Sequence, residues 1–352
     1  MPGRKMKTKN LLIIGPYPPP YGGVSIHIKR LQLLLAGCFK MYSIDESRVR
    51  KENIFNIRSL NVFGYLKRML QADIVHIHSG LLSLRLVHFI IASLFFKKKI
   101  FTIHGYEPGR GIIERTLDRI MLNNCSKTIF VSKEIADRFS IKKYIIKDAF
   151  LPPDINTEAE IPAALAAWIN QKQADGFTIC SANAWRLDSH NNEDMYGLDL
   201  CILAAQKIKN DGIKAAFVYV VCEDSGVIKI APYKKMIIEY GLQDIFYLFE
   251  QPLSFVQLIV QSDIVLRPTN TDGDALTVRE GLFFGKTVIA SDVVVRPEGT
   301  KLFSNRNAAA LAAMITTESN TVKKNKTVLN TITHAQQDYE QFYRHQIYNL
   351  PN

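Results

Sequence analysis

The chain has 352 residues, of which 47% are hydrophobic and 22% charged, a composition that excludes the disordered and fibrous classes. Its five cysteines form no C-x-x-C pair, which argues against a disulfide framework or a zinc site and predicts reduced thiols in a cytoplasmic protein. The net charge of +11 is uneven, because residues 1–150 contain 26 Lys and Arg against 10 Asp and Glu.

Short β-branched runs alternate with amphipathic segments through these first 150 residues. The expected strands are LLIIG (11–15), FKMYSI (39–44), DIVHIH (73–78), KIFTIH (99–104), TIFVS (128–132) and YIIKDAF (144–150). The alternation predicts a parallel sheet with crossover helices.

An apolar segment, residues 81–96, precedes three lysines in this basic half. It contains Arg85 and His88 and is shorter than the roughly 20 residues that span a bilayer. Two interpretations of FFKKK (95–99) stay open: a helix that rests on anionic lipid, or a core helix followed by a charged turn. No pattern for reading nucleic acid is present, so we expect an anionic membrane surface and no nucleic acid as partner.

The proline-rich segment LPPDINTEAEIPAA (151–164) predicts a domain linker. The strand pattern restarts after it, with FTICSA (177–182), AAFVYVV (215–221), IFYLFE (245–250), DIVLRP (263–268) and TVIASD (287–292). We therefore predict an α/β protein with two Rossmann-like parallel-sheet domains that face a central cleft.

The C-terminal part predicts a loop over residues 316–326 and a closing helix over about 323–348. The expected boundaries are 1–155 for a basic first domain, 156–325 for a second domain and 326–352 for a helix that packs back on the first domain.

Candidate site residues in the first half follow expected strands. Gly22 and Gly23 open a helix after a proline-rich turn, where backbone N–H groups favour an anion. His76 and His78 form an H-x-H pair, but no third ligand is evident near the strand ends, so we expect no metal. His104 follows a strand and is predicted to face the cleft.

The second half contains an arginine and an acidic turn at strand ends. Arg186 follows a strand and could hold a phosphate with two parallel bonds, unless it is only a surface residue. TDGDALTVREGLFFGK (271–286) places Asp272 and Asp274 before a helix and Glu280 within it. One interpretation is that an aspartate caps the helix and that Glu280 lies on its solvent face. The other is that these carboxylates bind a ligand.

In the order of these pieces, the sequence resembles the family-4 retaining glycosyltransferases of the GT-B fold, also called glycosyl transferases group 1. That family has two glutamates separated by seven residues in a strand–turn–helix, followed by A-x-G-x-P-V-I-A. The matching positions here are Asp272 and Glu280, followed by GLFFGKTVIASD. PYPPPYGGVSIHI, ADIVHIHSG, FTIHG and TIFVSKEIADRF also resemble the family's pieces, so the similarity extends from about Asn10 to Gly299.

The resemblance implies an acceptor-binding first domain, a nucleotide-sugar-binding second domain and a role for each matching position. Glu280 would bind the ribose. Asp272, with Asp274 as its substitute, would bind the sugar hydroxyls, and Arg186 would neutralise the leaving diphosphate. His104 would lie beside the reacting sugar or its acceptor. The remaining implied donor contacts are Gly22 and Gly23, the helix start at Leu276 and Thr277, and a base site at Phe249, Glu250 and Gln251.

Two positions depart from the family pattern. Asp272 is one methylene shorter than the usual glutamate, and Tyr196 occupies the position of a lysine that would hold the diphosphate. The implied function is a retaining, metal-independent hexosyltransferase without cofactor, using a nucleoside-diphosphate sugar, with UDP favoured over GDP. Its acceptor would be a glycan or lipid-linked glycan in cell-surface polysaccharide synthesis, in the cytoplasm and peripherally on the membrane. The alternatives are a nucleotide-sugar epimerase of the same fold and a non-catalytic nucleotide-sugar binder.

Overall fold

The structure is a computed structural model that describes residues 8–19, 22–106, 109, 111–222, 226–322 and 338–350. The chain divides into two compact units, residues 1–151 with 336–352, and residues 152–335.

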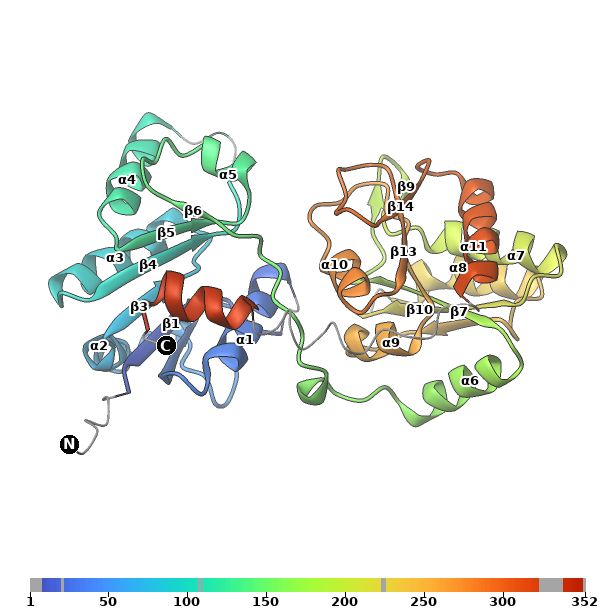
Figure 1. Cartoon of the computed structure of the whole chain (residues 1–352), viewed down its shortest axis with the longest axis horizontal. Helices are drawn as coiled ribbons and strands as arrows, with labels where there is room; N and C mark the ends of the chain where they lie inside the picture. The colour runs from blue at the N-terminus through green and yellow to red at the C-terminus, as the bar shows by residue number, and fades with distance from the viewer. Residues whose placement is uncertain are drawn as a thin grey trace. The chain divides into compact units, whose positions relative to one another are not determined.

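The first unit is a parallel sheet with crossover helices (Figure 1). Its strands are β1 (Asn10–Gly15), β2 (Lys40–Asp45), β3 (Ile74–Ile77), β4 (Lys98–Ile103), β5 (Lys127–Phe130) and β6 (Ile145–Ile146). Its helices are α1 (Gly23–Leu35), η1 (Ile57–Ser59), α2 (Val62–Gln71), α3 (Leu82–Leu94), α4 (Ile112–Asn123), α5 (Lys133–Asp137) and the π-helix η3 (Phe342–Ile347). The strand order is β2-β1-β3-β4-β5-β6, and every pair is parallel.

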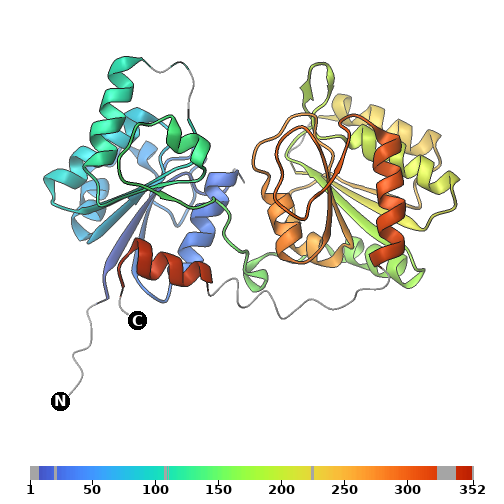
Figure 2. The ribbon, with the colours of Figure 1, turned by 45° about the horizontal axis from the view of Figure 1, so that its top comes forward.

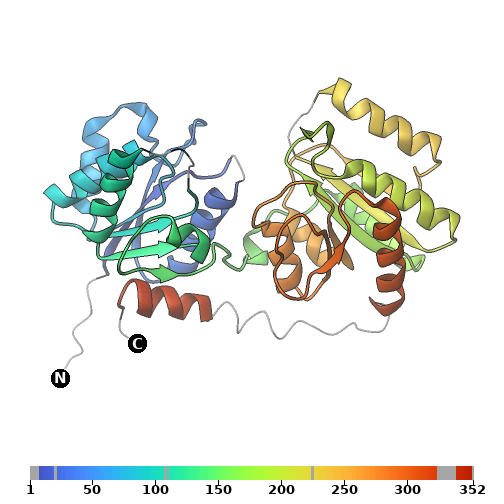
Figure 3. The ribbon, with the colours of Figure 1, turned by 90° about the horizontal axis from the view of Figure 1, so that it is seen from above.

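Both faces of this sheet are covered. Helices α2, α3, α4 and α5 pack on one face through a core that includes Met69 and Leu122. Helix α1 and the C-terminal segment cover the other face, where Leu31 meets Tyr343 and Ile347 (Figures 1 and 3). The central strand β1 is buried on both sides, which explains its unbroken apolar run LLIIG.

The second unit repeats this architecture (Figure 2). Its strands are β7 (Thr178–Ala184), β8 (Ser189–His190), β9 (Glu193–Asp194), β10 (Ala215–Val221), β11 (Phe246–Phe249), β12 (Ile264–Arg267), β13 (Thr287–Ser291) and β14 (Lys301–Phe303). Its helices are η2 (Ile155–Thr157), α6 (Ala163–Ala174), α7 (Leu198–Asn210), α8 (Val227–Glu239), α9 (Phe255–Gln261), α10 (Leu276–Phe283) and α11 (Ala308–Val322). The parallel sheet has the order β11-β10-β7-β12-β13-β14, and β8 and β9 form a separate antiparallel pair.

Helices again cover both faces of the second sheet. α7, α8 and α11 pack on one face around Ile202, Ile237 and Ile315. α6, α9 and α10 cover the other face through two smaller clusters that include Leu165 and Val278. Each parallel sheet has six strands, and the prediction of two parallel-sheet α/β domains is confirmed.

Several local predictions differ from the structure. The strand expected over 144–150 contains only two residues of β6, Ile145 and Ile146. The loop expected over 316–326 is wrong as far as Val322, because Leu311 and Ile315 pack on α7 and extend α11 to that residue. Residues 323–337, the start of the expected closing helix, lie outside the described part. In the described residues, no helix has the length and apolar character needed to cross a membrane.

Candidate active site

The second unit has a topological switch point between β7 and β12. From β7 the chain proceeds to β10 and β11 on one side of the sheet, and β12 then pairs on the other side. Open parallel sheets bind ligands beyond the carboxyl ends of the two strands at such a point. The loops after β7 and β12 are therefore the first place to look for a site.

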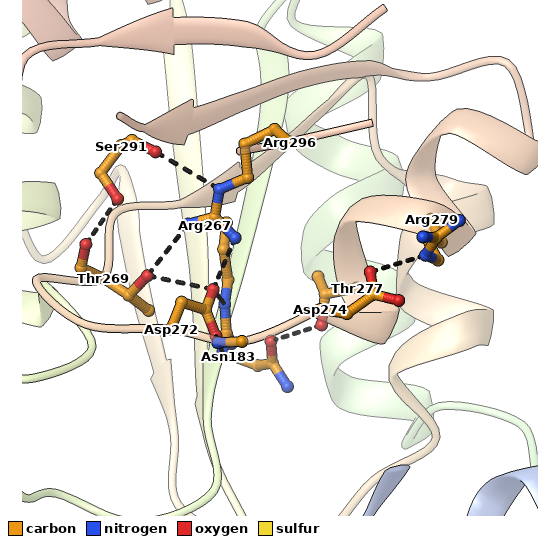
Figure 4. A network of polar contacts seen from close by, with 10 residues as sticks. Asn183, Arg267, Thr269, Asp272, Asp274, Thr277, Arg279, Ser291 and Arg296 are labelled. Carbon is orange, nitrogen blue, oxygen red and sulfur yellow. Dashed lines mark hydrogen bonds and ion pairs between the residues drawn. The ribbon is translucent and has the colours of Figure 1, made fainter. Parts of the chain in front are cut away.

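Asp272, in the loop after β12, is held by two arginines (Figure 4). Arg267, the last residue of β12, donates from Nε and Nη2 to the two carboxylate oxygens at 2.9 Å each. Arg296 donates from Nη1 to the same carboxylate at 2.7 Å. The Thr269 hydroxyl and the Gly273 N–H add bonds of 3.2 and 3.0 Å.

These bonds determine the state of the Asp272 carboxylate, which is only 7% exposed. Burial is the largest single influence and raises its pKa, but the bonds and charges of Arg267 and then Arg296 outweigh burial and lower the pKa to about 2. Protein donors occupy both oxygens, and the cluster of one carboxylate and two guanidiniums has an excess positive charge. It is therefore an anion-attracting group beside the switch point.

The N-terminus of α10 has no side-chain cap. Its N-cap is Ala275, and in the described part of the chain this position makes no side-chain capping bond. Asp274 instead accepts a bond of 2.6 Å from Nε of Arg279, on the surface of the same helix (Figure 4). The interpretation that Asp272 or Asp274 caps this helix is therefore wrong, because both carboxylates are paired with arginines.

Polar groups are buried along the inner side of α10. Glu280 is 5% exposed, so the interpretation that it lies on a solvent face is also wrong. One turn earlier, the Thr277 hydroxyl donates to Oδ1 of Asn183 on β7 at 3.2 Å, which joins the helix to the strand across the switch point. Leu276, the first residue of the helix, adjoins this contact. An uncapped helix start of this kind favours an anion, because its first N–H groups and the helix dipole are both positive.

Arg186 and Tyr196 lie in the loop after β7. The Arg186 side chain is 56% exposed and is paired with Asp188, with 3.1 Å between Nε and Oδ2. Such a surface pair adds little stability and can exchange its partner for a ligand. Tyr196 packs against the core, and the guanidinium of Arg267 lies 5.5 Å from the centre of its ring. A cation therefore lies next to Tyr196, the position at which the family resemblance implies a lysine.

Gly197 brings the loops after β7 and β12 into contact. It is the N-cap of α7, with φ of 72°, and a Cβ built on it would lie 2.2 Å from the carbonyl oxygen of Pro268. The approach needs glycine both for the left-handed backbone and for the space.

Replacing Gly197 by alanine should lower the free energy of unfolding by about 3 kcal/mol, since backbone strain and overpacking add. Gly176→Ala is the control, because Gly176 has φ of 80° but no atom within 4 Å of the added Cβ. It should cost only about 1 kcal/mol. Urea unfolding of both variants measures the difference, and equal losses would mean that the contact with Pro268 does not restrict this loop.

The proposed base site lies at the edge of the same sheet. Phe249 ends β11 and is partly buried against the core, Glu250 is paired with Lys234 at 2.6 Å, and Gln251 is exposed. Three strand spacings, about 14 Å, separate β11 from β12. The structure thus does not bring these residues into contact with the Asp272 cluster.

The glycines of the first unit open α1. Gly22 is its N-cap and donates to Oγ of Ser25 at 2.9 Å. A Cβ on Gly22 would come no closer than 4.0 Å to another atom, and one on Gly23 would meet nothing within 4 Å. Neither residue has a positive φ, so neither packing nor backbone geometry within the described chain requires glycine here.

His104 follows β4 and belongs to a cluster of imidazoles. Its Nε2 lies 3.0 Å from Nδ1 of His78, and His27 from α1 stands beside both rings. The expectation that no third side chain lies near the strand ends is wrong, since His27 supplies one. His76 does not join the cluster through its nitrogens, which bond Tyr348 at 2.6 Å and Thr102 at 2.8 Å.

Sequence patterns missed the arginine partners of Asp272. Arg267 had one available signal, because it ends an apolar strand directly before Pro268. Arg296 is 24 positions beyond Asp272 and has no periodic relation to it, so only the fold shows their contact.

Comparison with known proteins identifies the fold. No protein-family model and no curated protein sequence matches the chain. Among solved structures, Anabaena Alr3699/HepE in complex with UDP and glucose is 13% identical, with a TM-score of 0.65 over 97% of this chain and 100% of that one. A glycosyltransferase from Rickettsia africae is 17% identical, with a TM-score of 0.63 over 95% and 98%. Sucrose-phosphate synthase from Thermosynechococcus elongatus is 15% identical, with a TM-score of 0.61 over 97% and 98%. Over nearly its whole length, the chain has the GT-B fold of these glycosyltransferases.

Proposed function

We propose that the chain is a retaining glycosyltransferase that moves a hexose from a nucleoside-diphosphate sugar to a glycan or lipid-linked glycan acceptor. The similar structures include one solved with UDP-glucose and one named as a lipopolysaccharide outer core galactosyltransferase, which favours UDP as the nucleotide. The role we propose is in cell-surface polysaccharide synthesis.

The observation that carries this proposal is the start of α10 at the switch point. An uncapped helix N-terminus, an excess positive charge around Asp272 and the buried carboxylate of Glu280 occur together there. The first two features suit a diphosphate, and a carboxylate suits vicinal hydroxyls as a hydrogen-bond acceptor. A nucleoside diphosphate presents both kinds of group.

We assign the donor contacts accordingly. The N–H groups of Leu276 and Thr277 bind the diphosphate, and Glu280 binds the ribose hydroxyls. Arg186 stabilises the negative charge that grows on the leaving phosphate, with Arg267 as the second cation in place of the lysine that Tyr196 replaces. The base lies towards Phe249, Glu250 and Gln251.

We propose a different role for Asp272 from the one that the family resemblance implied. With its oxygens engaged by Arg267 and Arg296, it positions these two guanidiniums. Asp274 is more exposed, at 48%, and its single arginine partner leaves acceptor capacity for a sugar hydroxyl.

The first unit supplies the remaining contacts in this proposal. The open space at Gly22 and Gly23 lets a ligand approach the backbone at the start of α1. His104, which burial and the neighbouring histidines keep neutral by lowering its pKa, lies beside the reacting sugar or the acceptor. Retention then follows from attack on the face that the phosphate leaves, and the phosphate takes the acceptor proton. This chemistry requires no metal.

Product analysis tests the proposal. The protein is incubated with UDP-glucose or UDP-galactose, with and without a short glycan or lipid-linked acceptor, and UDP release and the anomeric configuration of the product are measured. We expect acceptor-dependent UDP release and retained configuration. An isomerised UDP sugar without acceptor would establish the epimerase, and binding without turnover would establish the non-catalytic binder.

One face of the first unit supports a membrane-held acceptor. On α3, which packs against α4, the side chains of Val87, Ile90 and Leu94 are 44%, 52% and 68% exposed. Phe96, just after α3, is 95% exposed, and α4 adds Ile113 at 76%. Lys97 follows and bonds the carbonyl oxygen of Leu70, and Lys98 and Lys99 begin β4. Exposed apolar side chains on α3 suit a lipid surface, and the basic composition of the first unit suits anionic lipid.

Replacing Ile90 and Leu94 together by aspartate should reduce binding to phosphatidylglycerol-containing vesicles by at least about tenfold, because two apolar anchors are lost and two negative charges are added. Vesicle flotation at moderate salt measures this. Ile228→Asp is the control, since Ile228 on α8 is 90% exposed but belongs to the second unit. If the wild-type chain does not float, or the double variant floats equally, the membrane part of the proposal fails and the enzymatic part is unaffected.

A further inference from the structure

Three histidines meet at the switch point of the first sheet. From β1 the chain proceeds to β2 on one side and then to β3 on the other. His78 follows β3, His104 follows β4, and His27 comes from the second turn of α1. One ring nitrogen from each lies within 4.8 Å of the other two. Such a set offers three ligands on three different elements of one compact unit.

Among the described residues, two buried nitrogens of this cluster have no hydrogen-bond partner. Nδ1 of His27 lies 2.7 Å from the carbonyl oxygen of Ala149. A carbonyl only accepts, so Nδ1 has the proton and Nε2 of His27 presents a lone pair. That Nε2 and the Nε2 of His78 are both buried without a partner among the described residues. Each side chain is only 2% exposed.

Burial without a partner is costly and calls for an explanation. An unsatisfied buried polar group destabilises the folded chain. His76 shows how the same fold satisfies an imidazole, because Tyr348 and Thr102 bond both of its nitrogens. At His27 and His78 a ligand that accepts electron pairs would replace the missing partners.

The three imidazoles are held in the form that binds metals. Burial is the main cause that lowers the pKa of His27 to about 4, and burial with the neighbouring histidines lowers the pKa values of His78 and His104 well below the ordinary value. The uncharged imidazole is the form that binds a metal.

We infer that His27, His78 and His104 bind a divalent transition-metal ion of the zinc class. Three imidazoles and an open position are a known zinc arrangement, whereas Mg²⁺ and Ca²⁺ require oxygen ligands. The bond from Nδ1 of His27 to Ala149 is the outer contact that fixes the tautomer and orientation of a metal-bound imidazole.

Geometry sets the adjustment that binding requires. Zinc–nitrogen bonds of about 2.0–2.1 Å in a tetrahedron hold pairs of nitrogens about 3.3 Å apart. One ring nitrogen from each histidine lies within 4.8 Å of the other two, so ring rotations have to shorten these separations to about 3.3 Å. His104 is the least buried of the three.

The test uses untagged, chelator-treated full-length protein and Zn²⁺ or Co²⁺ as the probe. Competition with a chromogenic chelator gives the zinc affinity and stoichiometry, and the visible spectrum of bound Co²⁺ reports its coordination. We expect one ion per chain, intense tetrahedral Co²⁺ bands and a raised melting temperature. His27→Gln and His104→Gln should each weaken zinc binding by at least about tenfold, and exposed His190→Gln should not.

Three outcomes would overturn the inference: no saturation near one ion per chain, weak octahedral Co²⁺ bands, or wild-type affinity in both folded variants. If the variants do not fold, the Co²⁺ spectrum of the wild-type chain decides. UDP titrated into the same samples reports the donor site of the second unit separately. Failure of the metal site therefore differs from failure of the proposed transferase.

Discussion

Glu280→Gln should lower the affinity for a UDP sugar by about ten- to a hundredfold, because a bond to a charged acceptor contributes about 1.5–3 kcal/mol and glutamine replaces the carboxylate with a weaker acceptor. Glutamine has nearly the same volume as glutamate, which matters because Glu280 is 5% exposed and alanine would leave a cavity. Isothermal titration with UDP and with the UDP sugar measures the loss.

A matched variant separates binding from folding. Gln257→Glu makes the reverse exchange, of an amide for a carboxylate, on α9 of this unit. There the Gln257 side chain bonds the carbonyl oxygens of Ile155 and Glu158. It should disturb stability and leave UDP affinity within about threefold, because the Gln257 amide bonds the segment that contains Ile155 and Glu158 and not the start of α10. If Glu280→Gln instead lowers the melting temperature and preserves affinity, Glu280 is structural.

Asp272→Asn should lower the free energy of unfolding of the second unit by about 3 kcal/mol, because it leaves two largely buried guanidiniums without their counter-charge. Asp274→Asn is the control and should cost at most about 1 kcal/mol, since that pair is much more exposed. Urea unfolding at pH 7 measures both. Similar losses in the two variants would mean that the cluster does not hold Asp272 as described.

The stability that the Asp272 ion pairs contribute depends on pH. The pKa of Asp272 is depressed from 3.8 to about 2, so its stabilisation is complete above pH 4 and is lost as the pH falls towards 2. The difference in stability between the wild-type chain and Asp272→Asn should therefore shrink over this interval. A difference that stays constant would contradict the ion pairs.

The sequence predicted the architecture well because buried parallel strands have a strong pattern. AAFVYVV matched β10 residue for residue, since all seven residues are buried on both faces. Short or exposed strands were not predicted correctly: β6 is short, β14 has an exposed start, and the β8–β9 pair is polar. The sequence of each of these strands lacks a long apolar run.

The candidate site was predictable only in part. The strand–turn–helix that contains Glu280 could be predicted, because an apolar strand, a polar turn and a helical segment with an apolar face follow one another in the sequence. The partners of Asp272 were not, because Arg296 reaches it from a distant loop. His78 and His104 were named at strand ends, but His27 was missed, since α1, β3 and β4 come together only in the folded sheet.

We propose that the second unit binds a nucleotide sugar at the start of α10. A melting-temperature screen against UDP and GDP sugars tests this binding most directly. A donor at about a hundred times its Kd stabilises by about 2.7 kcal/mol, which raises the melting temperature by roughly 5 °C or more. We predict this rise for at least one nucleotide sugar with the wild-type chain, and a much smaller rise with Glu280→Gln. No rise at millimolar concentrations, or an equal rise in both proteins, would contradict the account.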